Sequence, residues 1–107
     1  LISSGAQVNL QSNNGAFALM FSALAGHTNT AVSLLTNEAT VNKKDYSGRT
    51  ALMGAAIRGH IETVQSLLKF AADINIKSNN GKTALNWASE MGQMKVVKLL
   101  QKNGAKE

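Results

Sequence analysis

The sequence predicts an all-α solenoid of stacked antiparallel helix pairs that are joined by β-turn or hairpin loops. Three observations support this prediction: a 33-residue period, glycines at fixed places in each unit, and apolar residues at three- and four-residue steps. The glycines in register are Gly15 with Gly48 and Gly81, and Gly26 with Gly59 and Gly92. A period of this length is typical of repeat architectures in which neighbouring units share one core.

The chain has the length and composition of a single folded domain spanning 1–107. It has 107 residues, of which 44% are hydrophobic and 16% charged, so disorder is not expected. The register divides it into the end of a truncated repeat at 1–11, repeats at 12–44 and 45–77, and a C-terminal capping-like repeat at 78–107. Leu1 and Ile2 align with the end of a second helix, and we therefore expect a fragment of a longer array.

In the first unit, the polar turn SNNG at 12–15 is expected to open a short Ala-rich helix. Phe17 stands where the later units have Thr50 and Thr83, so this unit should have the least regular helix start. In the last unit, Gln101 and a set of lysines make the outer face of the second helix suited to water. Those lysines are Lys95, Lys98 and Lys102.

The middle unit shows the expected elements most clearly. Thr50 is placed to cap a helix over 51–57, and Gly59 can adopt the left-handed conformation that ends it. A second helix begins near His60, and its apolar residues share one face. They are Ile61, Val64, Leu67 and Leu68. Helices of about ten residues are marginal alone in water, so the pairs must stack.

The segments GRTALMGAAIRGHIETVQSLLKFAADIN and GKTALNWASEMGQMKVVKLLQKNGA resemble the ankyrin repeat, whose pattern runs G-x-T-P-L-H-x-A-A-x-x-G-H and ends in G-A-D-V-N. The resemblance covers essentially the whole chain. Ala replaces the usual Pro at positions 18, 51 and 84. Met20, Met53 and Asn86 replace the usual His, so the hydrogen bonds that this His makes to neighbouring repeats are expected to be absent or changed.

The sequence predicts no catalytic centre, metal site or cofactor. The GKT string at 81–83 lacks the earlier Gly of a phosphate-binding loop, and we interpret it as a turn followed by a helix cap. His27 and His60 stand at the family's usual His position, where a structural role is favoured over catalysis. No further His or Cys exists to complete a metal site. We therefore expect a protein that is not an enzyme.

Asn75 is a candidate for modification by resemblance alone. Its context, eight residues after Leu67 and preceded by Asp73, resembles that of ankyrin-repeat asparagines that are hydroxylated in animal cells. The alternative is that Asn75 only stabilises its turn by side-chain hydrogen bonding.

The resemblance also implies that a protein or peptide binds the concave surface made by the turn tips and first helices. The first unit would contribute Gln11, Asn13, Asn14, Ala16, Leu24 and Ala25. The later units would contribute Lys44, Tyr46, Ser47, Arg49, Ile57, Arg58, Lys77, Asn79, Asn80, Lys82, Glu90 and Met91. Tyr46, Arg49 and Arg58 stand out because Tyr and Arg are enriched in binding hot spots. Trp87 either lines this groove or fills space beside Gly54, and we favour packing.

Five basic residues of this surface, Lys44, Arg49, Arg58, Lys77 and Lys82, favour an acidic partner. One alternative is a basic nucleic-acid-binding scaffold, which is disfavoured because only Tyr46 offers an exposed aromatic for stacking. Another is a targeting or regulatory segment of a larger, enzyme-bearing protein. No apolar run approaches the roughly 20 residues of a membrane span, and the chain contains no cysteine. We therefore expect an intracellular, cytoplasmic protein without membrane insertion.

Overall fold

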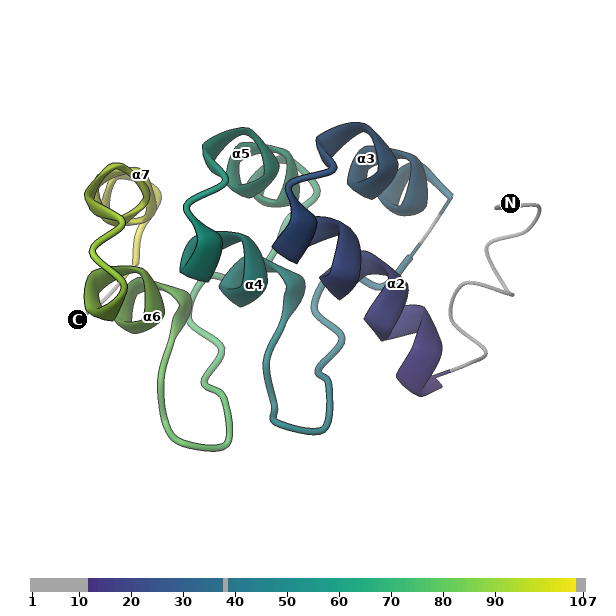
Figure 1. Ribbon diagram of the computed structural model, residues 1–107, viewed down its shortest axis with the longest axis horizontal. Coiled ribbons are helices and arrows are strands. Elements are labelled where there is room, and N and C mark those ends of the chain that lie inside the picture. Colours follow the sequence, from purple (N-terminus) through teal and green to yellow (C-terminus); the bar gives the residue numbers. More distant parts are fainter. Residues whose placement is uncertain (1–11, 38, 106–107) are drawn as a thin grey trace.

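The fold is seen in a computed structural model that describes residues 12–37 and 39–105 as six helices in two layers (Figure 1). The first layer contains α2 (Ser12–Ala25), α4 (Ala51–Arg58) and α6 (Ala84–Glu90). The second contains α3 (Thr28–Thr36), α5 (Ile61–Lys69) and α7 (Met94–Lys102). The described residues contain no strand, and the prediction of an all-α solenoid of stacked helix pairs is confirmed.

The core runs continuously between the two layers because each helix packs against its counterpart in the next pair. Within the first layer, α4 contacts both α2 and α6. Small buried residues in this layer let the helix backbones approach closely. Four alanines of this layer are fully buried: Ala23, Ala55, Ala56 and Ala88. Leu67 and Leu100 complete the core from the second layer.

The helix ends follow the predicted capping residues in the second and third pairs. The Oγ1 of Thr50 accepts a hydrogen bond from the backbone N–H of Met53, and Gly59 ends α4 in the left-handed region at φ 72°. Thr83 and Asn86 form a reciprocal capping box, with bonds of 3.2 Å and 3.1 Å. Asn86, which replaces the expected His, thus stabilises the start of its own helix. The interpretation of 81–83 as a turn and cap is confirmed.

The first helix differs from its predicted extent. The structure places 12–15 inside α2, so the expected polar turn there is wrong. The cause is visible in the aligned positions, since α4 and α6 start directly after Thr50 and Thr83 whereas position 17 is Phe. Phe has no oxygen that could cap the orphan N–H groups and fix the helix start at that point.

The stacked pairs are joined by side-chain hydrogen bonds that recur at equivalent positions. The Nε2 of His60 lies 2.9 Å from the carbonyl oxygen of Leu24, and the Nε2 of Gln93 donates to that of Ile57 at 3.0 Å. Each bond reaches 36 residues back, to the end of the preceding first-layer helix. The structural role predicted for His60 is therefore confirmed, and Gln93 performs the same role one repeat later.

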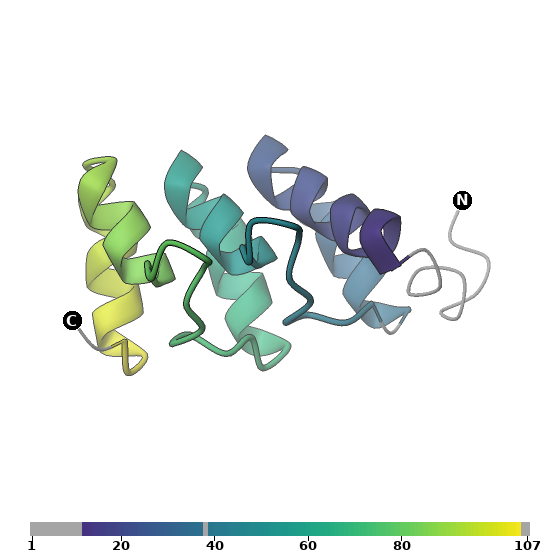
Figure 2. The ribbon, with the colours of Figure 1, turned by 90° about the horizontal axis from the view of Figure 1, so that it is seen from below.

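The loops that join α3 to α4 and α5 to α6 project together from the layer of α2, α4 and α6 (Figure 1). Seen from below, the two loops lie next to each other on this side of the molecule (Figure 2). Their tips and the neighbouring first-layer helices form the face on which the sequence placed a partner.

Candidate binding site

Each loop ends in a tight turn, which we call the 45–49 tip and the 78–82 tip. The backbone N–H of Asp45 donates to the carbonyl of Arg49 at 2.9 Å, and that of Ser78 donates to the carbonyl of Lys82 at 2.8 Å. In the 45–49 tip, the Oδ1 of Asp45 also accepts from the backbone N–H groups of Ser47 and Arg49. Asp in this place fits its known preference for turns, where its carboxylate bonds the following backbone.

The two tips are hydrogen-bonded to each other through Asn79. Its backbone N–H donates to the carbonyl of Ser47, and its Nδ2 donates to the carbonyl of Tyr46, both at 2.9 Å. This approach needs Gly48, because a Cβ at that position would lie 2.8 Å from the Asn79 nitrogen. Gly48 also has φ 77°, where other residues are strained.

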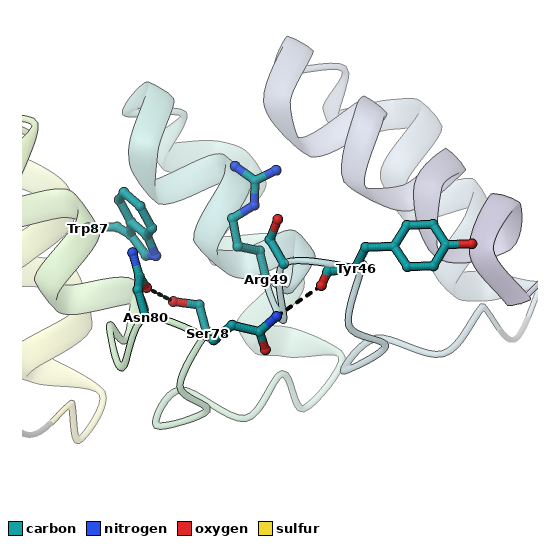
Figure 3. A pocket seen from close by; sticks show the side chains of 7 residues that line it. Tyr46, Arg49, Ser78, Asn80 and Trp87 are labelled. Atoms are coloured by element: carbon teal, nitrogen blue, oxygen red, sulfur yellow. Dashed lines mark hydrogen bonds between the residues drawn. The ribbon is translucent and has the colours of Figure 1, made fainter.

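A pocket of about 390 Å³ lies where the two tips meet α6. Trp87 forms one side, Arg49 rises on the other, and Ser78 and Asn80 lie between them (Figure 3). The residues lining the pocket are Tyr46, Ser47, Arg49, Ser78, Asn79, Asn80 and Trp87. The Tyr46 ring points away from Trp87 (Figure 3), and the residue is 81% exposed.

The charged side chains of the two tips form two ion pairs around this pocket. The Nε of Arg49 lies 3.3 Å from the Oδ2 of Asp45, and the Nζ of Lys82 lies 2.6 Å from the Glu90 carboxylate. The same Nζ lies 4.7 Å from the centroid of the Trp87 ring, a cation–π distance. The four side chains sum to zero charge, so the surplus positive charge of the chain resides elsewhere.

The structure separates the three residues that the sequence grouped as the most partner-like. Tyr46 and Arg49 line the pocket together, whereas Arg58 does not. Arg58 ends α4 and Arg49 precedes its first residue, so about 12 Å of helix lies between them. The helix holds the two arginines at its opposite ends, so Arg58 lies outside the pocket, and a role of all three residues in binding stays a prediction.

The remaining predicted residues lie around this pocket in two groups. Lys44 and Lys77 directly precede the tips and are exposed, with no ion pair among the described residues. Ile57, Glu90 and Met91 lie at the far ends of α4 and α6. Ser47, Asn79, Asn80 and Lys82 belong to the tips themselves.

The predicted first-unit residues do not form a third tip. Asn13, Asn14 and Ala16 lie within α2, and Gln11 falls outside the described residues. Leu24 is half-buried and Ala25 exposed. The site is therefore concentrated on the second and third pairs.

Trp87 lines the pocket as one of the two alternatives expected, but the place beside Gly54 that was favoured for it belongs to other side chains. It packs against the hydrophobic core and also lines the pocket. The space in front of Gly54 is occupied by Met20 and Leu24. Ser78 also lines the pocket, which the sequence analysis did not predict. The signal that could have identified it is its position in the same turn as Asn79 and Asn80.

The fold and the two-tip pocket define the molecule as a helical-repeat scaffold with a polar hollow on its loop face. Among residues 12–37 and 39–105, no three His, Asp or Glu side chains gather as a metal site would need. The same part of the chain holds no helix that is long and apolar enough to cross a membrane.

A family model of ankyrin repeats in three copies matches residues 1–78 and 34–107. The chain therefore belongs to the ankyrin-repeat family, whose members are generally protein–protein interaction modules. No curated protein matches the chain.

Proposed function

We propose that this domain is a non-catalytic module that binds a peptide or a protein surface on the face made by the two tips and the first-layer helices. The observation that supports this most directly is the pocket between the tips, flanked by a Tyr46 side chain that is 81% exposed. A tyrosine turned into solvent at a loop tip adds nothing to the core, whereas tyrosines are enriched among the residues that dominate binding energies.

The charge distribution supports an acidic partner. Lys44 and Lys77 lie beside the tips and Arg58 lies at the end of α4, each exposed and without an ion pair in the described part of the chain. Unpaired cations around the pocket speed the approach of an acidic partner and fix its orientation more than they add affinity. The contacts that hold the partner are then expected at Tyr46 and Arg49.

The test is affinity capture with mass spectrometry, followed by measured affinities for a captured partner. Tyr46→Ala and Arg49→Gln should each weaken binding by about 1 to 2 kcal/mol, as hot-spot truncations do. Lys98→Gln on α7 is the matched control, because it removes the same charge as Arg49→Gln from an exposed position outside the site. If Tyr46→Ala and Arg49→Gln bind every captured partner as tightly as Lys98→Gln does, the site is wrong.

Nucleic-acid binding remains the alternative that the basic composition suggests. It requires an affinity for nucleic acid that falls steeply with salt, so the absence of any response to oligonucleotides at low salt would remove it. We propose a cytoplasmic location, on the cysteine-free composition. A regulatory role beside an enzyme on a longer chain would use the same face.

Asn75 is proposed as a hydroxylation site because its sequence context resembles that of hydroxylated ankyrin-repeat asparagines. The residue is exposed, and its backbone N–H donates to the Oδ1 of Asp73 at 3.0 Å. At the equivalent position, the Oδ1 of Asn42 accepts from the Asp73 backbone N–H at 2.7 Å, which is a structural role. Intact mass after exposure to an asparaginyl hydroxylase tests the modification.

A further inference from the structure

We infer that the pocket between the tips takes one carboxylate, from an Asp or Glu side chain of a bound peptide, with Arg49 as the group that binds it. This inference rests on the proposed function, because it identifies which part of a peptide enters the site. It assigns distinct roles to Arg49 and Trp87, which face each other across the pocket (Figure 3).

Arg49 is the one ionised side chain in the pocket lining, and most of its donors are unused. Its contact with Asp45 runs through Nε, so the N–H groups of the two terminal nitrogens have no partner among the described residues. The other polar groups are largely engaged with each other: Asn79 donates to Tyr46, and the Ser78 hydroxyl donates to Asn80. The hydrogen-bond donors of this pocket that have no partner therefore favour a ligand with a hydrogen-bond acceptor.

Trp87 supplies the apolar side of the pocket and a second donor. Its ring packs against the core, which fixes its position, and its Nε1 has no acceptor in the described part of the chain. This nitrogen is buried, so an acceptor reaches it only after neighbouring side chains shift. The ring can meanwhile cover the methylene groups that carry a carboxylate, as aromatic rings do for amphipathic side chains.

The charges favour a carboxylate over a phosphate. Asp45 and Glu90 already neutralise Arg49 and Lys82, so the surroundings of the pocket have no net charge. A phosphate with nearly two negative charges would meet two nearby carboxylates, and the unpaired Lys44 and Lys77 lie beside the tips but outside the pocket lining. A single carboxylate needs only one forked contact, which the terminal nitrogens of Arg49 provide.

The probe is a library of random peptides displayed on phage, selected on the intact chain and counter-selected on the Arg49→Gln variant. In that variant, Asp45 keeps its two backbone hydrogen bonds, so the 45–49 tip is expected to stay folded. Circular dichroism checks this. We expect the selected peptides to share an Asp or Glu at one position.

One selected peptide is then synthesised with that residue as Glu, Gln and phosphoserine. The Glu form should bind at least about tenfold more tightly than either substitute, the loss expected when a hydrogen bond to a charged group is removed. Binding should also move the indole N–H resonance of Trp87, which is the sole tryptophan and so gives one such signal. Arg49→Gln should abolish the Glu preference, Arg49→Lys should retain part of it, and Lys98→Gln should leave it unchanged.

Equal binding of the Glu and Gln forms, or tighter binding of the phosphoserine form, overturns the carboxylate assignment while the proposed function stands. Loss of the preference in Lys98→Gln as well shows that total charge, and not this pocket, selects the peptide, and likewise overturns it. A selection that enriches no peptide at all also overturns the carboxylate assignment, whereas the proposed function is decided by the affinity capture and by the Tyr46→Ala and Arg49→Gln affinities.

Discussion

Gly48 and Gly81 occupy the same position in consecutive repeats, which makes them a matched pair for measuring what the contact between the tips contributes. Both have positive φ, at 77° and 82°. A Cβ on Gly48 would lie 2.5 Å from the Oδ1 and 2.8 Å from the backbone nitrogen of Asn79, whereas a Cβ on Gly81 meets nothing within 4 Å. Replacing either glycine with Ala therefore imposes the same backbone strain, but only Gly48→Ala also creates a steric conflict.

The expected losses follow from these two terms. A left-handed conformation costs an L-residue about 1 to 2 kcal/mol, and the smaller conformational freedom of unfolded Ala offsets about 0.4 to 1 kcal/mol of that. Gly81→Ala should thus lower the free energy of unfolding by about 1 kcal/mol. Gly48→Ala must also displace Asn79, which breaks its two bonds to the other tip. At about 0.5 to 1.5 kcal/mol for each bond, the total loss is about 2 to 4 kcal/mol.

The assay is urea unfolding followed by circular dichroism, with the free energy of unfolding extrapolated to water for both variants and the wild type. If the slope of the free energy of unfolding against urea concentration is the same for all three proteins, unfolding exposes the same surface area in each. If Gly48→Ala and Gly81→Ala lose the same stability, the contact through Asn79 contributes nothing measurable, and the account of the joined tips is refuted.

Two other substitutions test the backbone and the bonds between repeats. Ala71 has φ 66° where Gly104 stands one repeat later, so Ala71→Gly should raise the free energy of unfolding by about 0.5 to 1 kcal/mol in the same assay; a lower stability would contradict the assigned strain. His60→Ala should cost about 1 to 3 kcal/mol by leaving the Leu24 carbonyl without its partner. His60→Gln should restore most of this, because Gln93 makes the equivalent bond. A loss in His60→Gln as large as in His60→Ala would mean that the imidazole acts through packing.

Sequence periodicity predicted those features of the fold that depend on one repeat at a time. The caps at Thr50 and Thr83 and the helix end at Gly59 are local, since each depends on a residue type at a fixed place in its own turn. The extent of α2 escaped prediction for the same reason: alignment with the later units suggested a start that only a capping residue could enforce, and Phe17 is not one.

The sequence predicted most of the residues that line the pocket, but not how the charged residues around it are paired. The tip residues were identified because the repeat pattern leaves them free of a folding role. The ion pairs of these residues were not predicted. Lys82 pairs with Glu90, which lies eight residues later at the end of α6, and the repeat pattern contains no signal for a pair at this spacing. The sequence counted Arg49 and Lys82 as free cations, and the structure shows that both are already partly neutralised.

The pocket links binding to the stacking of repeats. Its lining comes from the 45–49 tip of one repeat and from the 78–82 tip and Trp87 of the next, so it exists only while the two repeats are docked. Ankyrin-type stability is a sum of unit and interface contributions, and any ligand of this pocket adds its binding free energy to that one interface. In the proposed function, the two bonds from Asn79 therefore serve folding and binding together. A change that weakens them lowers affinity even though Asn79 need not touch the ligand, because the fraction of molecules with a formed pocket falls.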